Sequence, residues 1–414
     1  MTSLAHLLPR FRPVLAGLIS TMWVCCAMAA EPPPLSGVRQ ALDAAWARQP
    51  QAQAWAERQN AAQAQVDAAR SVTPGPSSLS VSQQQDRLNQ NRGQQEWELE
   101  WATPLWLPGQ RAAQTLEAEH HVTSTHSQAL ALRWQLAGEV RQAWWAAASA
   151  QTAWTLAKQK VETAHALAQT VTRRVQAGDL ARVDGNLAQA EWLSAQTEEL
   201  AARQSTMQAQ QALEALTGLT AHPSTEPEAL LDRTQPDLTQ HPSLMAHSSA
   251  LQVAQSRLGV LQKSQRGAPE LALRWNSQRG DRHEPYAQAV GVKLTVPLSS
   301  APLVNRDQAL ARADLAQADA ELAQAATRIQ MAIQQAQQEL DSAAQQLQLA
   351  QQRQALTQDN LQLAQRAFDL GEADLPTLLR ARASAYDAQS ATQQQTIALA
   401  AARSRVLQTQ GVLP

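Results

Sequence analysis

The chain has 414 residues and a formal net charge of −2, a balance that gives no reason to expect a nucleic-acid partner. Aromatic residues make up only 4% of the sequence. Because a compact core normally draws on large side chains, this composition argues against a single globule and favours extended helices packed at close range. Beyond the N-terminus no apolar run approaches the ~18 residues of a membrane-spanning helix, so any membrane segment would have to consist of strands.

The N-terminus has the organisation of a cleaved secretory signal. Two arginines precede an apolar stretch over 14–28, which ends at an A-x-A sequence. We expect residues 1–29 to be a signal peptide, with an uncleaved anchor as the alternative. Cleavage would remove Cys25 and Cys26, the only cysteines, so the mature chain would have no disulfide, thiolate metal site or cysteine nucleophile.

Three kinds of landmark recur at a spacing of 192 or 193 residues. They are a Pro-Leu pair that closes an alternating run, a glycine inside a long helical pattern, and a proline that opens a helix: Pro104 and Pro297, Gly178 and Gly371, Pro50 and Pro242. The matched spacing predicts two structural repeats, 30–221 and 237–414, joined by a Pro-rich linker at 222–236. Each repeat reads as a helix, a pair of strands, a very long helix, a glycine-containing turn and a helix.

Strict alternation of polar and apolar residues predicts two strands in each repeat, at about 78–86, 95–104, 269–278 and 286–298. Alternate side chains point to opposite faces of a strand, so each pair has one apolar and one polar face. The apolar face is expected to meet lipid and comprises Trp97, Leu99, Trp101, Leu271, Leu273 and Trp275. The polar face is expected to line a wet lumen and comprises Glu96, Glu98, Glu100, Arg274 and Lys293.

The remaining sequence predicts helices. The longest cover about 108–176 and 302–370, and at about 1.5 Å per residue each is roughly 100 Å long. Shorter helices are expected before the strands, at about 35–72 and 238–266, and after the glycine turns, at about 180–217 and 374–410. A seam with alternating spacings of four and three predicts coiled-coil packing of the second long helix: Ile329, Ile333, Ala336, Leu340, Ala343, Leu347 and Ala350.

Four strands are too few to close a barrel. An open sheet edge in hydrocarbon leaves backbone groups unsatisfied at several kcal/mol each, so transmembrane strands require a barrel shared between chains. Two chains would supply eight strands, which side chains largely fill, whereas three supply twelve, enough for a lumen. The expected fold is therefore mainly α with transmembrane β, and the expected object is a duct. No catalytic residue, cofactor or metal site is predicted, and the sequence has no G-x-S-x-G or H-E-x-x-H element.

From about Leu35 to Leu407 the chain resembles the TolC family of outer-membrane channel components. The segment 104–111 (PLWLPGQR) resembles the P-L-x-x-x-G-K-R junction between strand and helix that is common in the heavy-metal (cobalt–zinc–cadmium) branch, and 296–308 is similar to its counterpart in the second repeat. The segments 174–180 and 366–372 resemble the two helix-turn-helix tips of the family.

The resemblance implies a homotrimer with a twelve-stranded β-barrel in the outer membrane of a Gram-negative bacterium and a periplasmic α-barrel of long coiled-coil helices. The tips would dock onto a periplasmic adaptor (membrane fusion protein) and an inner-membrane resistance-nodulation-division pump. The implied function is passive conduction of substrate, heavy-metal cations above all, to the exterior. A drug-efflux or type I protein-secretion duct is the alternative, and a periplasmic coiled-coil adaptor is the alternative from another class.

The resemblance also implies roles for residues at the tips. Adaptor docking would involve Arg174, Gly178, Asp179, Arg366, Gly371 and Glu372, although the glycines equally suit simple turn chemistry. A gate would involve Asp184, Thr377 and Arg380. Asp184 also suits a helix-start carboxylate, and Thr377 at its equivalent place predicts that the second repeat contributes no acidic ring. Phe368 stands where the family frequently has a tyrosine.

Histidines 120, 121 and 126 do not have the i,i+3 or i,i+4 spacing of helical metal ligands, so we expect them on a solvated helix face. His283 falls in a charged loop between two strands, where no specific role is expected.

Overall fold

The computed structural model describes residues 37–88, 91–220, 223–229 and 238–414. The expected signal peptide and about half of the Pro-rich linker lie outside these residues. The chain divides into two units, 1–33 and 34–414, and the first of them also lies outside the described part.

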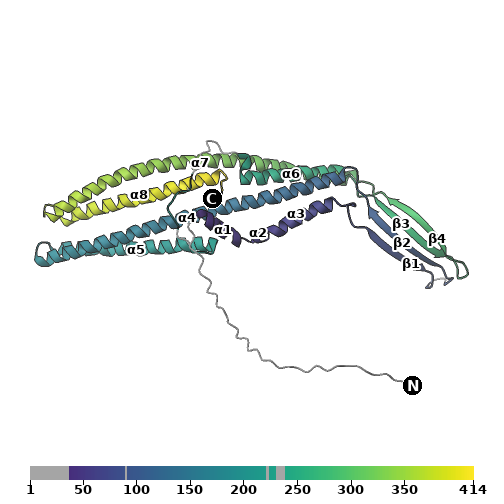
Figure 1. Ribbon diagram of the computed structural model, residues 1–414, viewed down its shortest axis with the longest axis horizontal. Coiled ribbons are helices and arrows are strands. Elements are labelled where there is room, and N and C mark those ends of the chain that lie inside the picture. Colours follow the sequence, from purple (N-terminus) through teal and green to yellow (C-terminus); the bar gives the residue numbers. More distant parts are fainter. Residues whose placement is uncertain (1–36, 89–90, 221–222, 230–237) are drawn as a thin grey trace, which may run out of the picture. The chain divides into compact units, whose positions relative to one another are not determined.

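The elements of the second unit follow the same order twice (Figure 1). The first repeat contains α1 (Val38–Arg48), α2 (Pro50–Gln53), α3 (Trp55–Ala69), β1 (Ser78–Gln85), β2 (Gln95–Pro104), α4 (Gln110–Ala177) and α5 (Arg182–Thr217). The second contains the 3₁₀ turn η1 (Leu238–Gln240), α6 (Pro242–Lys263), β3 (Glu270–Arg279), β4 (Ala287–Thr295), α7 (Ala301–Asp369) and α8 (Leu375–Thr409). The last strand ends before Pro297, which has no N–H for a sheet.

The expected single helix at 35–72 is wrong, because the structure contains three helices there. Gln49 leaves the helical conformation with ψ 130°, and Pro50 becomes the first residue of α2. A proline inside a helix removes one backbone hydrogen bond and clashes with the preceding turn, so the helix is interrupted at this point. In the second repeat Pro242 begins α6 in the same way, with the side chain of His241 as the cap.

The helices form two long antiparallel hairpins, α4–α5 and α7–α8, which meet where α4 packs against α8 (Figure 1). The shorter helices complete the packing, with α3 against α4 and α6 between α4 and α7. One core cluster combines Leu42, Val140 and Trp144 with fully buried alanines, which allow a close approach of neighbouring helices. The seam of α7 is buried or half-buried along its length, as predicted.

The described part of the linker, 223–229, is held by a buried ion pair. The Arg141 side chain is only 4% exposed, and its Nε and Nη2 donate to the Glu228 carboxylate over 3.1 and 2.8 Å. Its Nη1 donates to Gln408 Oε1 and to the backbone oxygen of Val412, at 2.6 and 2.9 Å. One arginine of α4 therefore joins the linker to the C-terminal segment.

The four strands form one antiparallel sheet in the order β1-β2-β3-β4. Residues directly opposite each other share a face, and the register pairs Glu100 with Arg274 and Trp101 with Leu273. The large apolar side chains of the four strands therefore share one face, to which Gln83, Ser277 and Gln288 also belong, and Glu100, Arg274 and Lys293 lie on the other. Within the chain, β1 and β4 each have one unpaired edge. Among the described helices, none combines the length and the apolar character needed to cross a membrane.

Candidate functional site

The turns between the paired long helices depend on glycine. Gly178 and Gly371 have φ of 87° and 79°, in the left-handed region that other residues rarely adopt. The residue after each glycine donates a backbone hydrogen bond that closes the preceding helix. The Asp179 N–H donates to Arg174 O over 2.9 Å, and the Glu372 N–H donates to Ala367 O over 2.8 Å. A Cβ at either glycine would meet nothing within 4 Å, so the backbone conformation alone requires glycine.

Apolar packing holds the two turns together. Phe368 is 2% exposed and clusters with Val171, Leu375 and Leu378. The Arg174 guanidinium lies 5.1 Å from the centroid of the Phe368 ring, and its Nη1 donates to the backbone oxygen of Phe368 over 3.4 Å. Arg174 is therefore half-buried and engaged within the chain. The other five residues of the predicted docking set are exposed.

Both return helices begin with a carboxylate cap. In α5 the Asp184 side chain accepts from the Ala181 N–H over 3.2 Å. In α8 the cap is Asp374, which accepts from the Thr377 N–H over 3.0 Å, and the hydrogen bonds from Thr377 lower the pKa of Asp374. Thr377 stands at the place equivalent to Asp184 and is not acidic, and the carboxylate at the start of α8 is Asp374, one turn earlier. The absence of an acidic ring from the second repeat stays a prediction. An Asp-x-x-Thr sequence before a helical run was the available signal.

The other two residues of the predicted gate lie together on α8. The Arg380 side chain donates to Thr377 Oγ1 over 3.1 Å and to Pro376 O over 3.3 Å, and both Thr377 and Arg380 are exposed. Both contacts lie within the first turns of the same helix, so they leave the rest of the guanidinium exposed.

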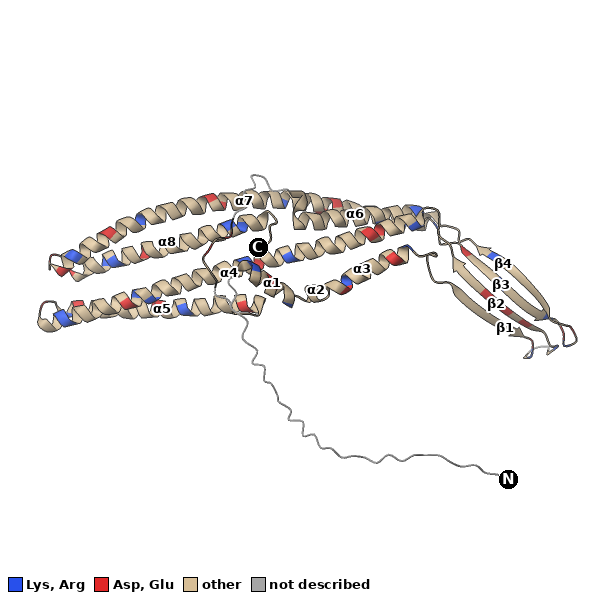
Figure 2. Cartoon of the chain, in the orientation of Figure 1, with Lys and Arg blue, Asp and Glu red and all other residues tan. Residues whose placement is uncertain are grey.

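The five predicted lumen residues lie on one face of the sheet and most of them are ion-paired. Arg274 contacts Glu98 at 2.6 Å and Glu100 at 2.7 Å, and Lys293 lies 3.5 Å from Glu100. Glu96 makes no ion pair within the residues that the structure covers. Acidic and basic residues therefore occur together on the strands, as the colours of Figure 2 show, and local pairing offsets much of the negative charge.

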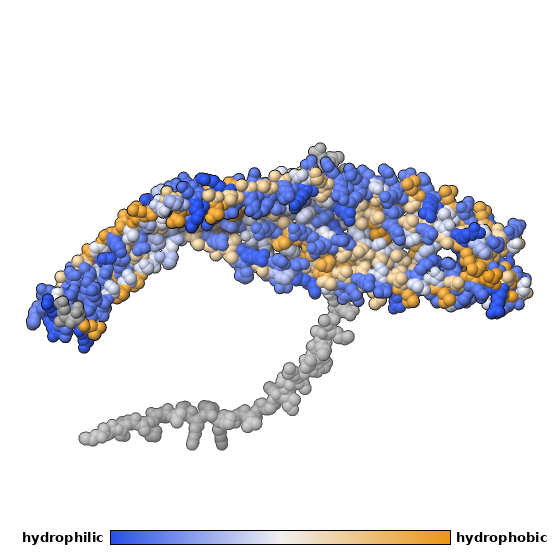
Figure 3. Space-filling view, turned by 180° about the vertical axis from the view of Figure 1, so that it is seen from behind, coloured by the Kyte–Doolittle hydropathy of each residue, from blue (hydrophilic) through white to orange (hydrophobic). Residues whose placement is uncertain are grey.

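The opposite face of the sheet is apolar and exposed. Its members are 37–51% exposed on β2 and β3, where they are Trp97, Leu99, Trp101, Leu271, Leu273 and Trp275. On β4, Val290 and Val292 are each 72% exposed. Hydrophobic patches are visible along this part of the surface at the left of Figure 3. A contiguous apolar face of this kind is rare on a soluble monomer and indicates a surface that is covered by something else.

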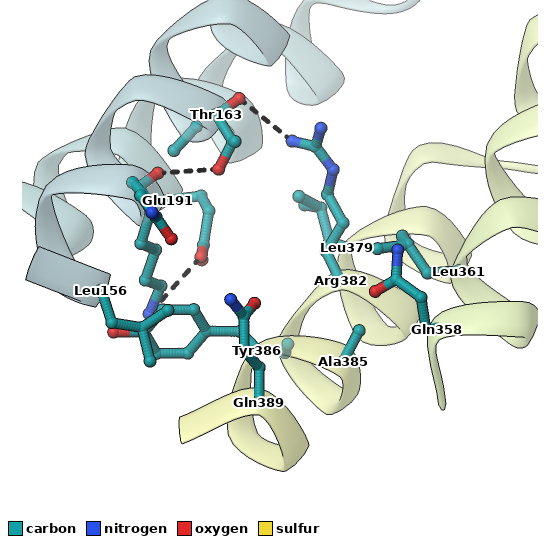
Figure 4. Close-up of a pocket in the computed structure, with 14 residues that line it drawn as sticks. Leu156, Thr163, Glu191, Gln358, Leu361, Leu379, Arg382, Ala385, Tyr386 and Gln389 are labelled. Carbon is teal, nitrogen blue, oxygen red and sulfur yellow. Dashed lines mark hydrogen bonds and ion pairs between the residues drawn. The ribbon is translucent and has the colours of Figure 1, made fainter. Parts of the chain in front are cut away.

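A cavity of about 240 Å³ lies between the two helical hairpins, with walls from α4, α5, α7 and α8 (Figure 4). Glu191 of α5 lies on one side, and Arg382 and Tyr386 of α8 lie on the other. Lys160 of α4 also lines the cavity. Burial lowers the pKa of Arg382, against the opposing effect of the Glu191 charge, and burial raises the pKa of Tyr386. Sequence periodicity gave no signal for this cavity, because it forms only where the hairpins meet.

The histidines differ in their surroundings. His120 is half-buried between α4 and α6, with Nδ1 at 3.2 Å from both Gln252 O and Ser256 Oγ, so its expected place on a solvated face was wrong. His121 and His126 are exposed. The His283 side chain is 95% exposed and bonds to Asp281. In the described ranges no three metal-ligating side chains come together.

A protein-family model covers most of the first repeat. Residues 41–219 match the outer membrane efflux protein family. None of the curated protein sequences matches the chain.

Solved channel structures share the fold over most of the chain. CusC superposes with a TM-score of 0.75 at 16% identity, over 91% of this chain and 92% of its own. The outer membrane protein VceC of Vibrio cholerae gives 0.71 at 16%, over 91% and 96%. The open MtrE outer membrane channel of Neisseria gonorrhoeae gives 0.71 at 15%, over 91% and 89%. The expected fold class, long helices with a few antiparallel strands, is therefore confirmed.

Proposed function

We propose that this protein is the outer-membrane channel component of a tripartite efflux system, and that it conducts substrate passively to the exterior. The observation that carries the proposal is the separation of the sheet into an exposed apolar face and a charged face, on a fold shared with solved outer membrane channels. Strands of this kind suit a wall between lipid and water. No catalytic role is proposed for any residue.

The unpaired edges of the sheet support an assembly of three copies. In hydrocarbon the backbone groups of β1 and β4 need partners, and pairing β1 of one copy with β4 of the next supplies them. Three copies give a twelve-stranded β-barrel with room for a lumen. In this arrangement the apolar face meets outer-membrane lipid, and the face with Glu96 and Arg274 lines the lumen.

Exposed heptad stripes on the outer helices also support the trimer. Because α5 packs on α4, and α7 on α8, these two helices lie at the ends of the hairpin order α5-α4-α8-α7. On α5 the stripe comprises Leu193, Leu200 and Met207, and on α7 it comprises Leu349, Leu356 and Leu363 and continues to the C-cap Leu370, all 52–74% exposed. If the α5 stripe of one copy packs against the α7 stripe of the next, the copies can close into a ring. The seven-residue spacing within each stripe suits coiled-coil contacts. The ring would be a periplasmic α-barrel.

The turns at Gly178 and Gly371 are proposed to dock onto a periplasmic adaptor, which connects the channel to an inner-membrane resistance-nodulation-division pump. The exposed docking residues Asp179, Arg366 and Glu372 offer charges of both signs at this end of the hairpins. The carboxylate caps Asp184 and Asp374 lie beside the same turns and are proposed, with Thr377 and Arg380, to line the constriction. Export through a cleaved signal peptide and residence in the outer membrane of a Gram-negative bacterium belong to the same proposal.

The proposed cargo is heavy-metal cations, and the resemblance of segment 104–111 to the heavy-metal branch supports it. Drug efflux or type I protein secretion is the second candidate. The paired charges on the sheet favour neither strongly, because Arg274 and Lys293 offset two of the three glutamates. Specificity in such a system would reside mainly in the pump.

The first test is the mass and single-channel conductance of the detergent-extracted protein. A species of three times the chain mass that forms stable pores in a planar bilayer is the expected result. A monomer without conductance would refute the channel and revive the coiled-coil adaptor. Cargo is tested separately, by metal and drug susceptibility of cells that lack the protein.

A further inference from the structure

The cavity between the hairpins contains Arg382, for which the described residues supply no counterion within ion-pair distance. Arg382 is half-buried, and in the part of the chain that the structure covers it makes a single hydrogen bond, from Nη1 to the backbone oxygen of Thr163 over 3.2 Å. A guanidinium has five N–H donors. Glu191 acts on Arg382 through its charge but does not come within ion-pair distance of it. Most donors of this partly desolvated cation are therefore left for a partner in the cavity.

The second cation of the cavity is already satisfied. Lys160 Nζ lies 2.8 and 2.6 Å from the two carboxylate oxygens of Glu198 and 4.0 Å from Glu191 Oε1. It also lies 4.6 Å from the centroid of the Tyr386 ring. Because Lys160 is held by one carboxylate and approached by another, Arg382 is the group with unmet charge.

We propose that this cavity binds a small oxyanion or carboxylate, with Arg382 as the principal donor. Planar guanidinium N–H pairs match the oxygens of phosphate and carboxylate groups, and such charge-assisted bonds strengthen when water is excluded. The volume of about 240 Å³ admits an ion of this size together with a few waters. The amides of Gln358 and Gln389 line the same space and add neutral donors.

A negative charge beside the site limits how tightly it can bind an anion. Glu191 faces the same space and opposes negative charge, which limits the affinity and excludes bulky polyanions. A bound anion contacts α8 on one wall and lies against α4 on the other, so it adds a link between the hairpins where Arg382 already reaches Thr163. The site concerns a single copy of the chain and does not depend on the proposed channel function.

The test is calorimetric titration of the detergent-extracted full-length protein with inorganic phosphate up to about 10 mM at constant ionic strength, where general salt effects on burial are small. Arg382→Gln is expected to weaken binding about tenfold or more, in line with the loss of a charge-assisted hydrogen bond. Glu191→Gln is expected to tighten binding about threefold, because it removes the opposing carboxylate. Arg353→Gln, an exposed arginine on α7, is the matched control and should bind phosphate like the wild type.

Arg382→Lys controls for a folding defect in Arg382→Gln, because it keeps the positive charge and loses only the planar guanidinium group. We expect it to bind phosphate more weakly than the wild type and more strongly than Arg382→Gln. A parallel titration with acetate distinguishes a carboxylate site from an oxyanion site. Equal phosphate binding by wild type and Arg382→Gln would refute the site. The absence of binding even in Glu191→Gln would refute it as well.

Discussion

The buried ion pair between Arg141 and Glu228 makes a sharp prediction about how the linker is attached. Replacing Glu228 with Gln keeps the shape of the side chain but removes its charge. Arg141 would then stay buried with a neutral amide in place of the carboxylate, and the hydrogen bond from Ser404 Oγ to Glu228 would weaken. The bonds from Arg141 to Gln408 and Val412 would remain.

The magnitude follows from burial. Removing one partner of a buried ion pair costs about 3–5 kcal/mol, whereas an exposed charge contributes about 0–1 kcal/mol. The Arg141 side chain is 4% exposed and that of Glu228 is 15% exposed, so we place the loss of stability at about 3 kcal/mol, the low end of the buried range. At about 2 °C per kcal/mol for a large domain, Tm should fall by about 6 °C. Glu226→Gln, in the same linker but exposed, should lower Tm by about 1 °C or less.

Tryptophan fluorescence during thermal unfolding is a suitable assay for Tm, and one of the contributing residues, Trp144, contacts the linker, because its Nε1 donates to the backbone oxygen of Ser224 over 3.3 Å. The double variant with Arg141→Met should recover part of the loss, since it removes the unpaired charge. Equal Tm values for Glu228→Gln and Glu226→Gln would refute the reasoning that this pair anchors the linker.

Three further predictions concern the sheet, the tip and pH. The double variant Trp97→Asp/Trp101→Asp should fail to assemble stably in the membrane, because charge on a lipid-facing strand is costly. Normal heat-resistant trimers on gels would contradict the assignment of this face to lipid. Gly371→Val should impair export and adaptor crosslinking without lowering trimer yield, since valine is strained at φ 79°; unchanged crosslinking would remove the docking role. Burial lowers the pKa of His241 below its ordinary value, so its contribution to stability is present above about pH 6.5 and declines as pH falls towards the folded-state pKa. His241→Asn keeps a capping acceptor and should flatten Tm against pH between about 7 and 5; an unchanged slope would exclude His241 as the cause.

Much of the fold could be predicted because it is periodic. The alternation around Trp97 and Glu98 fixes which face of a strand each side chain occupies, and any antiparallel register that pairs apolar with apolar residues keeps the two faces separate. The glycines at 178 and 371 mark the helix reversals because few other residues adopt positive φ. Pro50 was predicted to open a helix and does begin α2, but the helix expected over 35–72 was given as continuous, and its interruption at Gln49 was not predicted.

The candidate sites that were missed depend on contacts distant in sequence. Arg141 lies on α4, and its partner Glu228 lies 87 residues later in the linker. His120 was predicted to be solvated, because the sequence does not show that α6 packs against this part of α4. Asp374 was not predicted, because the 193-residue offset between the repeats places Thr377, three residues further on, at the position equivalent to Asp184.

The sequence by itself determined the repeat, the order of helices and strands, the two faces of the sheet and the positions of the turns. These follow from local rules, since backbone sterics and the periods of 2 and 3.6 act within a few residues. Only the tertiary structure decided that α4 meets α8, that Arg174 covers Phe368, and that Arg382 is half-buried with no counterion among the described residues. Burial and charge compensation arise from neighbours that the chain brings together only when it folds, and no local pattern encodes them.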